Sequence, residues 1–252
     1  MLPVPDNPIS ASKTKPVRPP IFCCVTDRHS LERGERSAEA ALLETIQGAI
    51  AAGIDWIQIR EKDLAAPKLL VLVKRAVLAR ESPIGCAQSS GPDSRRTRLI
   101  VNDRLDVALA AGADGVHLGR ESLPLREVVR WARGGNVLPE FLIGASCHTL
   151  AEAREAEDAG ASYVVFGPVF DTPSKRAFGP PTGIAQLSAV CAAVGMPVLA
   201  IGGVNAQNVA ECVRAGAAGI AAIRIFQDAK NIVELRSAVE QLRENSAGSA
   251  RR

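Results

Sequence analysis

The sequence has 252 residues, of which 47% are hydrophobic and 23% are charged, so the chain can bury a large core and global disorder is excluded. Thirty Lys and Arg residues against 27 Asp and Glu residues give a net charge of +3, which is too balanced for a protein that coats nucleic acid. The longest apolar stretch, 189–204, contains Pro197 and three glycines, so we expect neither a membrane helix nor a membrane partner.

The two ends of the chain differ in composition from its middle. Residues 1–20 contain six prolines and predict a flexible arm, residues 245–252 predict a flexible tail, and residues 21–244 form the expected catalytic domain. The sequence starts without a basic segment followed by an apolar one, which predicts a cytoplasmic protein. Its six cysteines show no CxxC spacing and are expected to be reduced, mostly buried thiols. The sequence is compatible with a homo-oligomer.

Short apolar runs alternate regularly with Ala- and Leu-rich stretches along the middle of the chain. The predicted strands are 21–25, 56–59, 99–101, 115–118, 141–143, 163–166, 198–201 and 219–223. The predicted helices are 38–52, 67–80, 105–111, 125–132, 150–159, 183–193, 206–215 and 233–242. Several of these helices end in Ala-Gly, where glycine adopts the left-handed cap conformation at no steric cost.

The predicted strands are apolar throughout, which indicates a parallel sheet that is buried on both faces. Eight β-α units over about 230 residues favour an α/β fold with a single closed (β/α)₈ TIM barrel, with a doubly wound open sheet as the alternative. The segment 81–96 is rich in Gly, Pro and Ser and interrupts this rhythm, so it is interpreted as a surface insertion.

Candidate functional residues follow the strands, because a barrel places its active site at their carboxyl ends. In the segment 58–62, alternation directs Gln58, Arg60 and Lys62 to the same side, which makes an anion site if Ile57 and Ile59 face the helices. A solvated cluster of charges is the alternative interpretation of this segment.

The next strands are followed by further polar candidates. Asn102 and Asp103 could hold Mg²⁺ or cap the next helix. His117 lies in an apolar run and is more simply interpreted as a packed core residue. Ser146 offers a hydroxyl to the mouth, and His148 is a candidate general acid or base, although the adjacent Thr149 could simply cap a helix.

Three loops late in the chain suit a phosphate group. The loop 167–175 is rich in hydroxyl groups and ends in Lys175, which could place a point charge on a second phosphate. Glycines after the seventh strand, and residues 223–224 after the eighth, lie where this fold commonly binds phosphate. The residues therefore predict two anion sites, which would serve two phosphorylated substrates or one bisphosphate.

The motifs taken together resemble the thiamine-phosphate synthase family over about 21–242. The matching stretches are QIREK (58–62), VNDR (101–104), GVHLG (115–119), GASCHT (144–149), FGPVFDTPSK (166–175) and IGGV (201–204). The family joins hydroxymethylpyrimidine diphosphate to thiazole phosphate and releases pyrophosphate. The resemblance implies a dissociative reaction, in which pyrophosphate leaves first and the thiazole nitrogen then attacks a pyrimidine-methyl cation.

The resemblance also implies a role for each matching residue. The pyrimidine diphosphate would be bound by Gln58, Ile59, Arg60, Glu61, Lys62, Asn102 and Ser146, with Arg60, Lys62 and Lys175 neutralising the departing pyrophosphate. Asp103 would ligate Mg²⁺, the expected cofactor. The thiazole phosphate would be held by Thr172, Pro173, Ser174, Gly203, Ile223 and Arg224.

The sequence departs from the family pattern after the fourth strand. Where the family usually has a GQxD motif with a second metal-binding aspartate, this chain has Arg120 and Ser122. A serine lacks the charge of a usual Mg²⁺ ligand. Arg224 replaces a common serine and Ser174 a usual threonine. A sister family, the thiazole tautomerases, resembles the synthases but isomerises a thiazole phosphate carboxylate without the diphosphate metal site. In that alternative His148 would transfer the proton.

Overall fold

The computed structural model describes residues 20–31, 37–82, 96–172 and 180–227. Eight parallel strands pair in chain order and close into a barrel, because the last strand pairs with the first. This confirms the TIM-barrel prediction over the open sheet. The strands are β1 (Ile21–Val25), β2 (Trp56–Ile59), β3 (Arg98–Asn102), β4 (Gly115–Leu118), β5 (Leu142–Cys147), β6 (Tyr163–Phe166), β7 (Val198–Ile201) and β8 (Gly219–Ala222).

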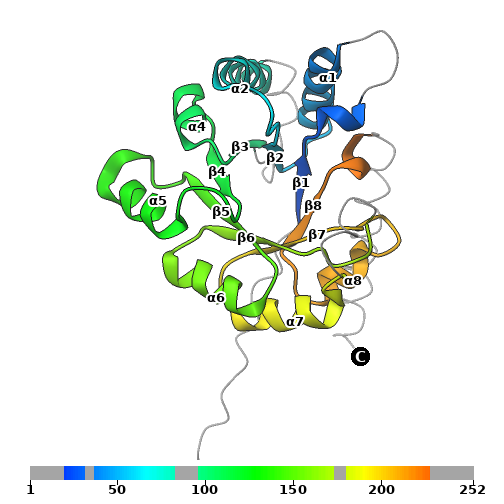
Figure 1. The fold of residues 1–252 in the computed structure, drawn as a ribbon. Coiled ribbons are helices and arrows are strands. Elements are labelled where there is room, and N and C mark those ends of the chain that lie inside the picture. The colour runs from blue at the N-terminus through cyan, green and yellow to red at the C-terminus, as the bar shows by residue number, and fades with distance from the viewer. Residues whose placement is uncertain (1–19, 32–36, 83–95, 173–179, 228–252) are drawn as a thin grey trace, which may run out of the picture.

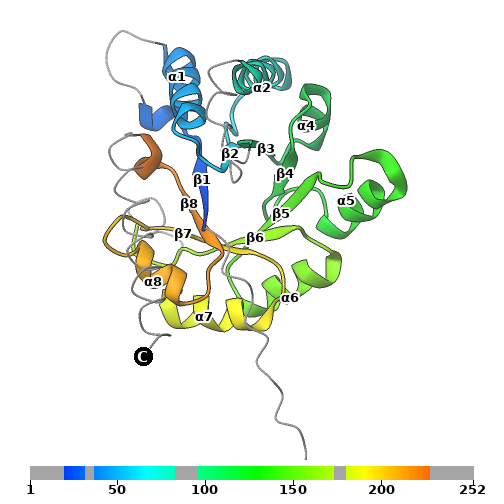
Figure 2. The same ribbon diagram turned by 180° about the vertical axis from the view of Figure 1, so that it is seen from behind.

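Helices surround the strands on the outside of the barrel, as Figures 1 and 2 show from opposite sides. They are α1 (Ala38–Ala51), α2 (Ala66–Glu81), α4 (Leu105–Ala111), α5 (Leu125–Trp131), α6 (Leu150–Ala159), α7 (Gly183–Ala193) and α8 (Val209–Arg214). Short helical turns cover η1 (Arg28–Leu31), η2 (Ala132–Asn136) and η4 (Arg224–Gln227). Several predictions fall outside the described residues. They concern both flexible ends except Pro20, the helix 233–242 and most of the 81–96 insertion. In the described part, no helix is long and apolar enough to cross a membrane.

Side chains alternate along each strand between two directions, which divides the core into two layers. Outward-facing residues such as Ile57 and Ile59 pack under the helices, while a smaller cluster that includes Ile100, Tyr163 and Leu199 fills the barrel interior. Since Ile57 and Ile59 face the helices, Gln58 faces the interior, as predicted. The five described cysteines are free thiols, and four of them are buried.

Two of the described elements differ from their predicted bounds by more than one residue. Strand β5 continues to Cys147, so Ser146 lies on the strand and not in the loop after it. Gly144 allows this, because a Cβ there would lie 2.1 Å from Cζ of Tyr163 on the neighbouring strand. Helix α8 begins at Val209 and not at 206. The side chain of Asn205 accepts hydrogen bonds from the backbone of residues 207 and 208, and this local turn competes with the helix.

Candidate active site

A row of polar side chains crosses the mouth of the barrel from β2 to the loop after β4. The Gln58 amide donates to Oδ1 of Asn102 over 2.9 Å, and the Asn102 amide donates to Oδ2 of Asp103 over 2.6 Å. The Ser122 hydroxyl donates to Oδ1 of Asp103, and the backbone N–H of Gly119 lies 3.3 Å from the same oxygen. Four of the residues singled out in the sequence, including the serine that replaces the second aspartate, are therefore joined in one hydrogen-bonded row.

Asp103 sits in a backbone conformation that few non-glycine residues adopt. Its φ is 61°, and its backbone N–H donates to the carbonyl of His117 on β4. Helix α4 has Arg104 at its N-cap without a side-chain cap bond, so the capping interpretation of Asn102 and Asp103 is wrong. This backbone conformation places the carboxylate beside Gly119 and Ser122 rather than on the helix end.

The donor set around Asp103 fits a weakly held Mg²⁺ better than a tightly held one. It offers one carboxylate and one hydroxyl, because Asn102 turns its N–H group and not its oxygen toward Asp103. The described residues contain no cluster of three or more His, Cys, Asp or Glu that could hold a metal. Mg²⁺ commonly binds through one or two carboxylates together with substrate phosphates and waters. A site of this kind would thus depend on the substrate for much of its coordination.

His117 lies inside the barrel, as its apolar surroundings predicted, but it also contacts a predicted site residue. Its Nε2 lies 2.8 Å from Oγ of Ser146, and its Nδ1 lies 3.2 Å from the hydroxyl of Tyr163. Burial is the main cause that lowers the pKa of His117 to about 4, with nearby Arg60 lowering it further and Asp103 opposing the shift. The imidazole is therefore neutral at pH 7. No pattern in the sequence predicted the contact between His117 and Ser146.

The segment after β2 presents cations and buries its carboxylate. Arg60 is half-buried and Lys62 is exposed, and neither side chain forms an ion pair within the described part of the chain. By contrast, the side chain of Glu61 is only 1% exposed, and Ile59 is fully buried under the helices. Both side chains therefore face the protein, and the contact of residues 59 and 61 with the substrate stays a prediction.

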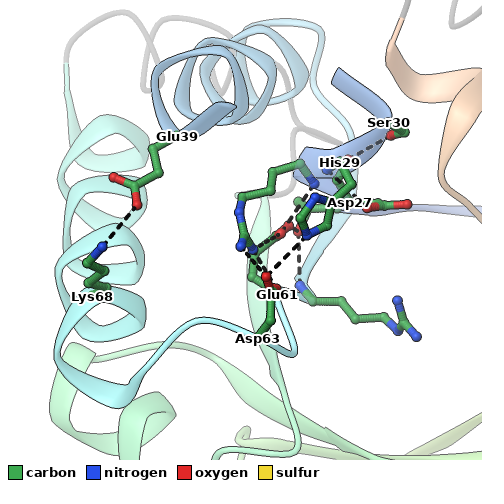
Figure 3. A network of polar contacts seen from close by, with 10 residues as sticks. Asp27, His29, Ser30, Glu39, Glu61, Asp63 and Lys68 are labelled. Atoms are coloured by element: carbon green, nitrogen blue, oxygen red, sulfur yellow. Dashed lines mark hydrogen bonds and ion pairs between the residues drawn. The ribbon is translucent and has the colours of Figure 1, made fainter. Parts of the chain in front are cut away.

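Glu61 instead connects the loops that follow β1 and β2 (Figure 3). Its carboxylate accepts from the Thr26 hydroxyl over 2.6 Å and from Nη1 of Arg28 over 3.1 Å, and the Thr26 hydroxyl also accepts from the backbone N–H of Arg60 over 2.9 Å. Arg28 in addition pairs with Asp63, and this hydrogen bond is the main cause that holds the pKa of Asp63 well below its usual range. No sequence pattern predicted a role for Thr26 or Arg28, although both follow the first strand.

The loops after β6 and β7 pack against each other at the predicted second anion site. Gly203 has a φ of +66°, and a Cβ there would lie 2.6 Å from the carbonyl oxygen of Asp171. Thr172, which follows Asp171 directly, is half-buried. After β8, Ile223 is half-buried, and Arg224 is exposed and begins η4. Pro173, Ser174 and Lys175 lie outside the described residues.

His148 is exposed at the end of β5, and its Nδ1 lies 2.5 Å from the carbonyl oxygen of Gly167. Thr149 caps helix α6 in a reciprocal capping box with Glu152, which confirms the capping interpretation of that residue. His148 therefore lies at the rim of the mouth, and the hydrogen bonds of the row do not include it.

A closed parallel barrel with cations, a carboxylate and a glycine-lined loop at its carboxyl-terminal face defines a phosphate-handling barrel enzyme as the class. The sequence pattern of the family described as thiamine monophosphate synthase matches residues 22–226. A thiamine-phosphate synthase from Methanoculleus marisnigri is 44% identical over 199 residues, which cover 79% of this chain and 83% of the relative. A thiamine-phosphate synthase from a Roseiflexus species is 38% identical over 222 residues, which cover 86% and 84% of the two chains.

The fold is also similar to that of a solved thiamine phosphate pyrophosphorylase from Pyrococcus furiosus, with a TM-score of 0.70 and 31% identity. The similarity covers 88% of this chain and 96% of that one. The chain therefore belongs to the thiamine monophosphate synthase family, as its motifs indicated, and its family is one of transferases.

Proposed function

We propose that the chain condenses hydroxymethylpyrimidine diphosphate with thiazole phosphate to give thiamine phosphate and pyrophosphate. The observation that carries this proposal is the row from Gln58 to Ser122, in a chain of this family, together with Arg60, which forms no ion pair among the described residues. Amide groups suit the pyrimidine ring, and cations suit the diphosphate, so both parts of one substrate meet at this side of the mouth.

The proposed reaction begins when the bond between the pyrimidine methylene and the diphosphate breaks, and pyrophosphate leaves with the electron pair. Arg60 and Lys62 stabilise the negative charge that develops on the leaving group, with Lys175 assigned the same role by its place in the motif. The thiazole nitrogen then attacks the resulting pyrimidine-methyl cation. The chain accelerates this step by holding the two substrates in contact.

Asp103 would hold Mg²⁺ in this scheme, with Ser122 and Asn102 as its neighbours. The ion would supply positive charge to the diphosphate and lower the cost of its departure. The exposed Arg120 follows Gly119 directly, and its guanidinium donates to Glu152 of α6 over 3.2 Å, so it is not directed at Asp103. We therefore assign the remaining neutralisation to Arg60 and Lys62 and not to Arg120.

The thiazole phosphate is assigned to the second anion site. Its ligands would be the backbone of Gly203 and of the turn at Ile223 and Arg224, together with the hydroxyl-rich 172–174 loop. The side chain of Asn208 donates to the Gly203 carbonyl over 3.0 Å, which fixes the orientation of this peptide. A peptide that turns its carbonyl toward Asn208 turns its N–H group the other way, where it would bind an anion.

The two-site arrangement can be tested by steady-state kinetics in which each substrate is varied in turn. Arg60→Gln removes a cation at the first site, so we expect kcat/KM for the pyrimidine diphosphate to fall by roughly 100-fold, as for the loss of a group that stabilises a leaving charge. The KM for thiazole phosphate should stay within about 3-fold of the wild-type value. Equal effects on both substrates would contradict separate sites.

The tautomerase alternative makes a different use of the same barrel. It predicts metal-independent turnover of a thiazole phosphate carboxylate that is lost in His148→Asn. The synthase proposal predicts that His148→Asn keeps condensation activity, because His148 lies at the rim and contacts the Gly167 carbonyl. Loss of condensation in this variant, with unchanged thermal stability, would show that His148 takes part in the condensation and would contradict this assignment.

A further inference from the structure

The interior of the barrel contains a polar contact that the proposed reaction does not yet use. Tyr163 on β6, His117 on β4 and Ser146 on β5 form a line from the dry interior to the mouth. Tyr163 is fully buried, His117 is 2% exposed, and Ser146 is half-buried. Polar groups are costly inside an apolar barrel, so a hydrogen-bonded line of three side chains suggests a role beyond packing.

The direction of each hydrogen bond follows from the donors available. A buried phenol hydroxyl must donate its proton, and in the described part of the chain His117 is the hydrogen-bond partner that the Tyr163 hydroxyl has. Nδ1 of His117 must then be the acceptor. A neutral imidazole with a bare Nδ1 carries its proton on Nε2, and that proton points to Oγ of Ser146.

Ser146 is left with one unused donor. Its oxygen accepts from His117, and within the described residues the Ser146 side chain has no second hydrogen-bond partner. The hydroxyl proton is therefore free to point toward the mouth. Arg60 follows the last residue of β2, and Ser146 is the second-last residue of β5, so a cation and this hydroxyl donor lie at the same end of the barrel.

We propose that Tyr163 and His117 are positioning residues that fix Ser146 as a hydrogen-bond donor to an anionic phosphate oxygen of the substrate. This inference rests on the proposed function for the identity of the anion, but the hydrogen-bond directions do not depend on it. Without Tyr163, the imidazole could carry its proton on Nδ1 and accept from Ser146. The serine would then turn its proton inward and present lone pairs to a phosphate.

The first test is the tautomer of His117 in the full-length protein, measured by ¹⁵N NMR of the imidazole nitrogens. The chain has three histidines, so the signal can be assigned with His29→Gln and His148→Gln variants. We expect the Nε2–H tautomer in the wild type and a mixture of tautomers in Tyr163→Phe. An Nδ1–H tautomer in the wild type would overturn the proposal.

The second test is binding of pyrophosphate with Mg²⁺, measured by calorimetry. Ser146→Ala should weaken binding roughly 10-fold, as expected for a lost hydrogen bond to a charged group, and Tyr163→Phe by roughly 3-fold. Tyr163→Phe should have no further effect in the Ser146→Ala background, because it acts through Ser146. Independent effects that multiply would overturn the proposal.

The control for folding is the melting temperature of each variant. Phenylalanine keeps the ring of residue 163 against Trp56, whose ring centroid lies 4.7 Å away, so the packing of this contact is retained. If the wild type shows the Nε2–H tautomer and the coupled pyrophosphate effects but makes no thiamine phosphate, the proposed function fails while the positioning role stands. If thiamine phosphate forms but the two variants act independently, the positioning role fails alone.

Discussion

At the residue scale, the second anion site depends on a backbone conformation at Gly203 that other residues adopt only with strain. Its φ is +66°, and a Cβ would also lie 2.7 Å from Cβ of Phe170. Gly112 offers a matched control, because its φ is +69° but no atom lies within 4 Å of the position of its Cβ. Alanine variants of the two glycines therefore distinguish the effect of backbone strain from the effect of crowding at the site.

We expect Gly203→Ala to raise the KM for thiazole phosphate by roughly 10-fold, because the new methyl group displaces the 170–171 loop. Gly112→Ala should lower stability by about 1 kcal/mol through backbone strain alone and leave both KM values unchanged. Steady-state kinetics and thermal unfolding of the two variants check this. An unchanged KM for thiazole phosphate in Gly203→Ala would show that this loop does not bind the thiazole phosphate.

The second residue-scale prediction concerns the serine that occupies the position of the family's second aspartate. Ser122→Asp places another carboxylate beside Asp103, so we expect Mg²⁺ to bind the substrate-free protein roughly 10-fold more tightly. Titration calorimetry with MgCl₂ measures this directly. Glu121→Gln, which changes an exposed neighbour, is the control and should have no effect. Unaltered affinity in Ser122→Asp would mean that Mg²⁺ does not bind beside Asp103.

At the scale of elements, the loops after β1 and β2 are tied together by one buried carboxylate. Glu61 accepts hydrogen bonds from Thr26 and from both the backbone and the side chain of Arg28. These bonds fix the loop that presents Arg60 and Lys62. The same guanidinium also binds Asp63, but the Asp63 side chain is 53% exposed, so water screens that pair.

Glu61→Gln should lower the free energy of unfolding by about 2 kcal/mol, because it weakens charge-assisted hydrogen bonds to a buried acceptor. It should also raise the KM for the pyrimidine diphosphate by roughly 10-fold, since the cations of the loop lose their fixed positions. Asp63→Asn is the matched control and should change neither quantity measurably. Chemical denaturation and kinetics check both, and equal effects of the two variants would refute a special role for Glu61.

The sequence predicted the elements well and the polar contacts within the barrel poorly. Most strand bounds follow from short apolar runs that end at polar residues, a local signal that the folded structure retains. The contact between His117 and Ser146 joins two strands, and a residue pattern along one strand carries no information about its neighbours. The extension of β5 was missed for a related reason, since Gly144 has low strand propensity but fits against Tyr163.

At the scale of the whole molecule, one end of the barrel carries the candidate site and the other carries a buried ion pair that contributes to stability. The carboxyl ends of the strands carry the candidate site, while Arg80 and Asp114 form an ion pair at the amino ends, where Asp114 also accepts from the backbone N–H of Leu99. The side chain of Arg80 is 2% exposed, whereas Arg96, which binds the same carboxylate, is 58% exposed. Stability and activity should therefore respond to different substitutions.

Arg80→Met should lower the free energy of unfolding by about 3 kcal/mol, because it leaves Asp114 without its buried partner. Arg96→Met should lower it by less than about 1 kcal/mol. Both folded variants should keep wild-type kcat and KM below their melting temperatures. Urea denaturation and assays at low temperature test this, and a selective loss of kcat in Arg80→Met would show that the two ends are coupled.

The most direct test of the proposed function is a condensation assay with the purified chain, both phosphorylated substrates, and either Mg²⁺ or EDTA. We predict that thiamine phosphate and pyrophosphate form in equal amounts with Mg²⁺, and that EDTA abolishes their formation. That result would establish that a site with Asp103 as its single carboxylate supports the reaction. No product under either condition, with the folded state verified by thermal unfolding, would contradict the proposed function.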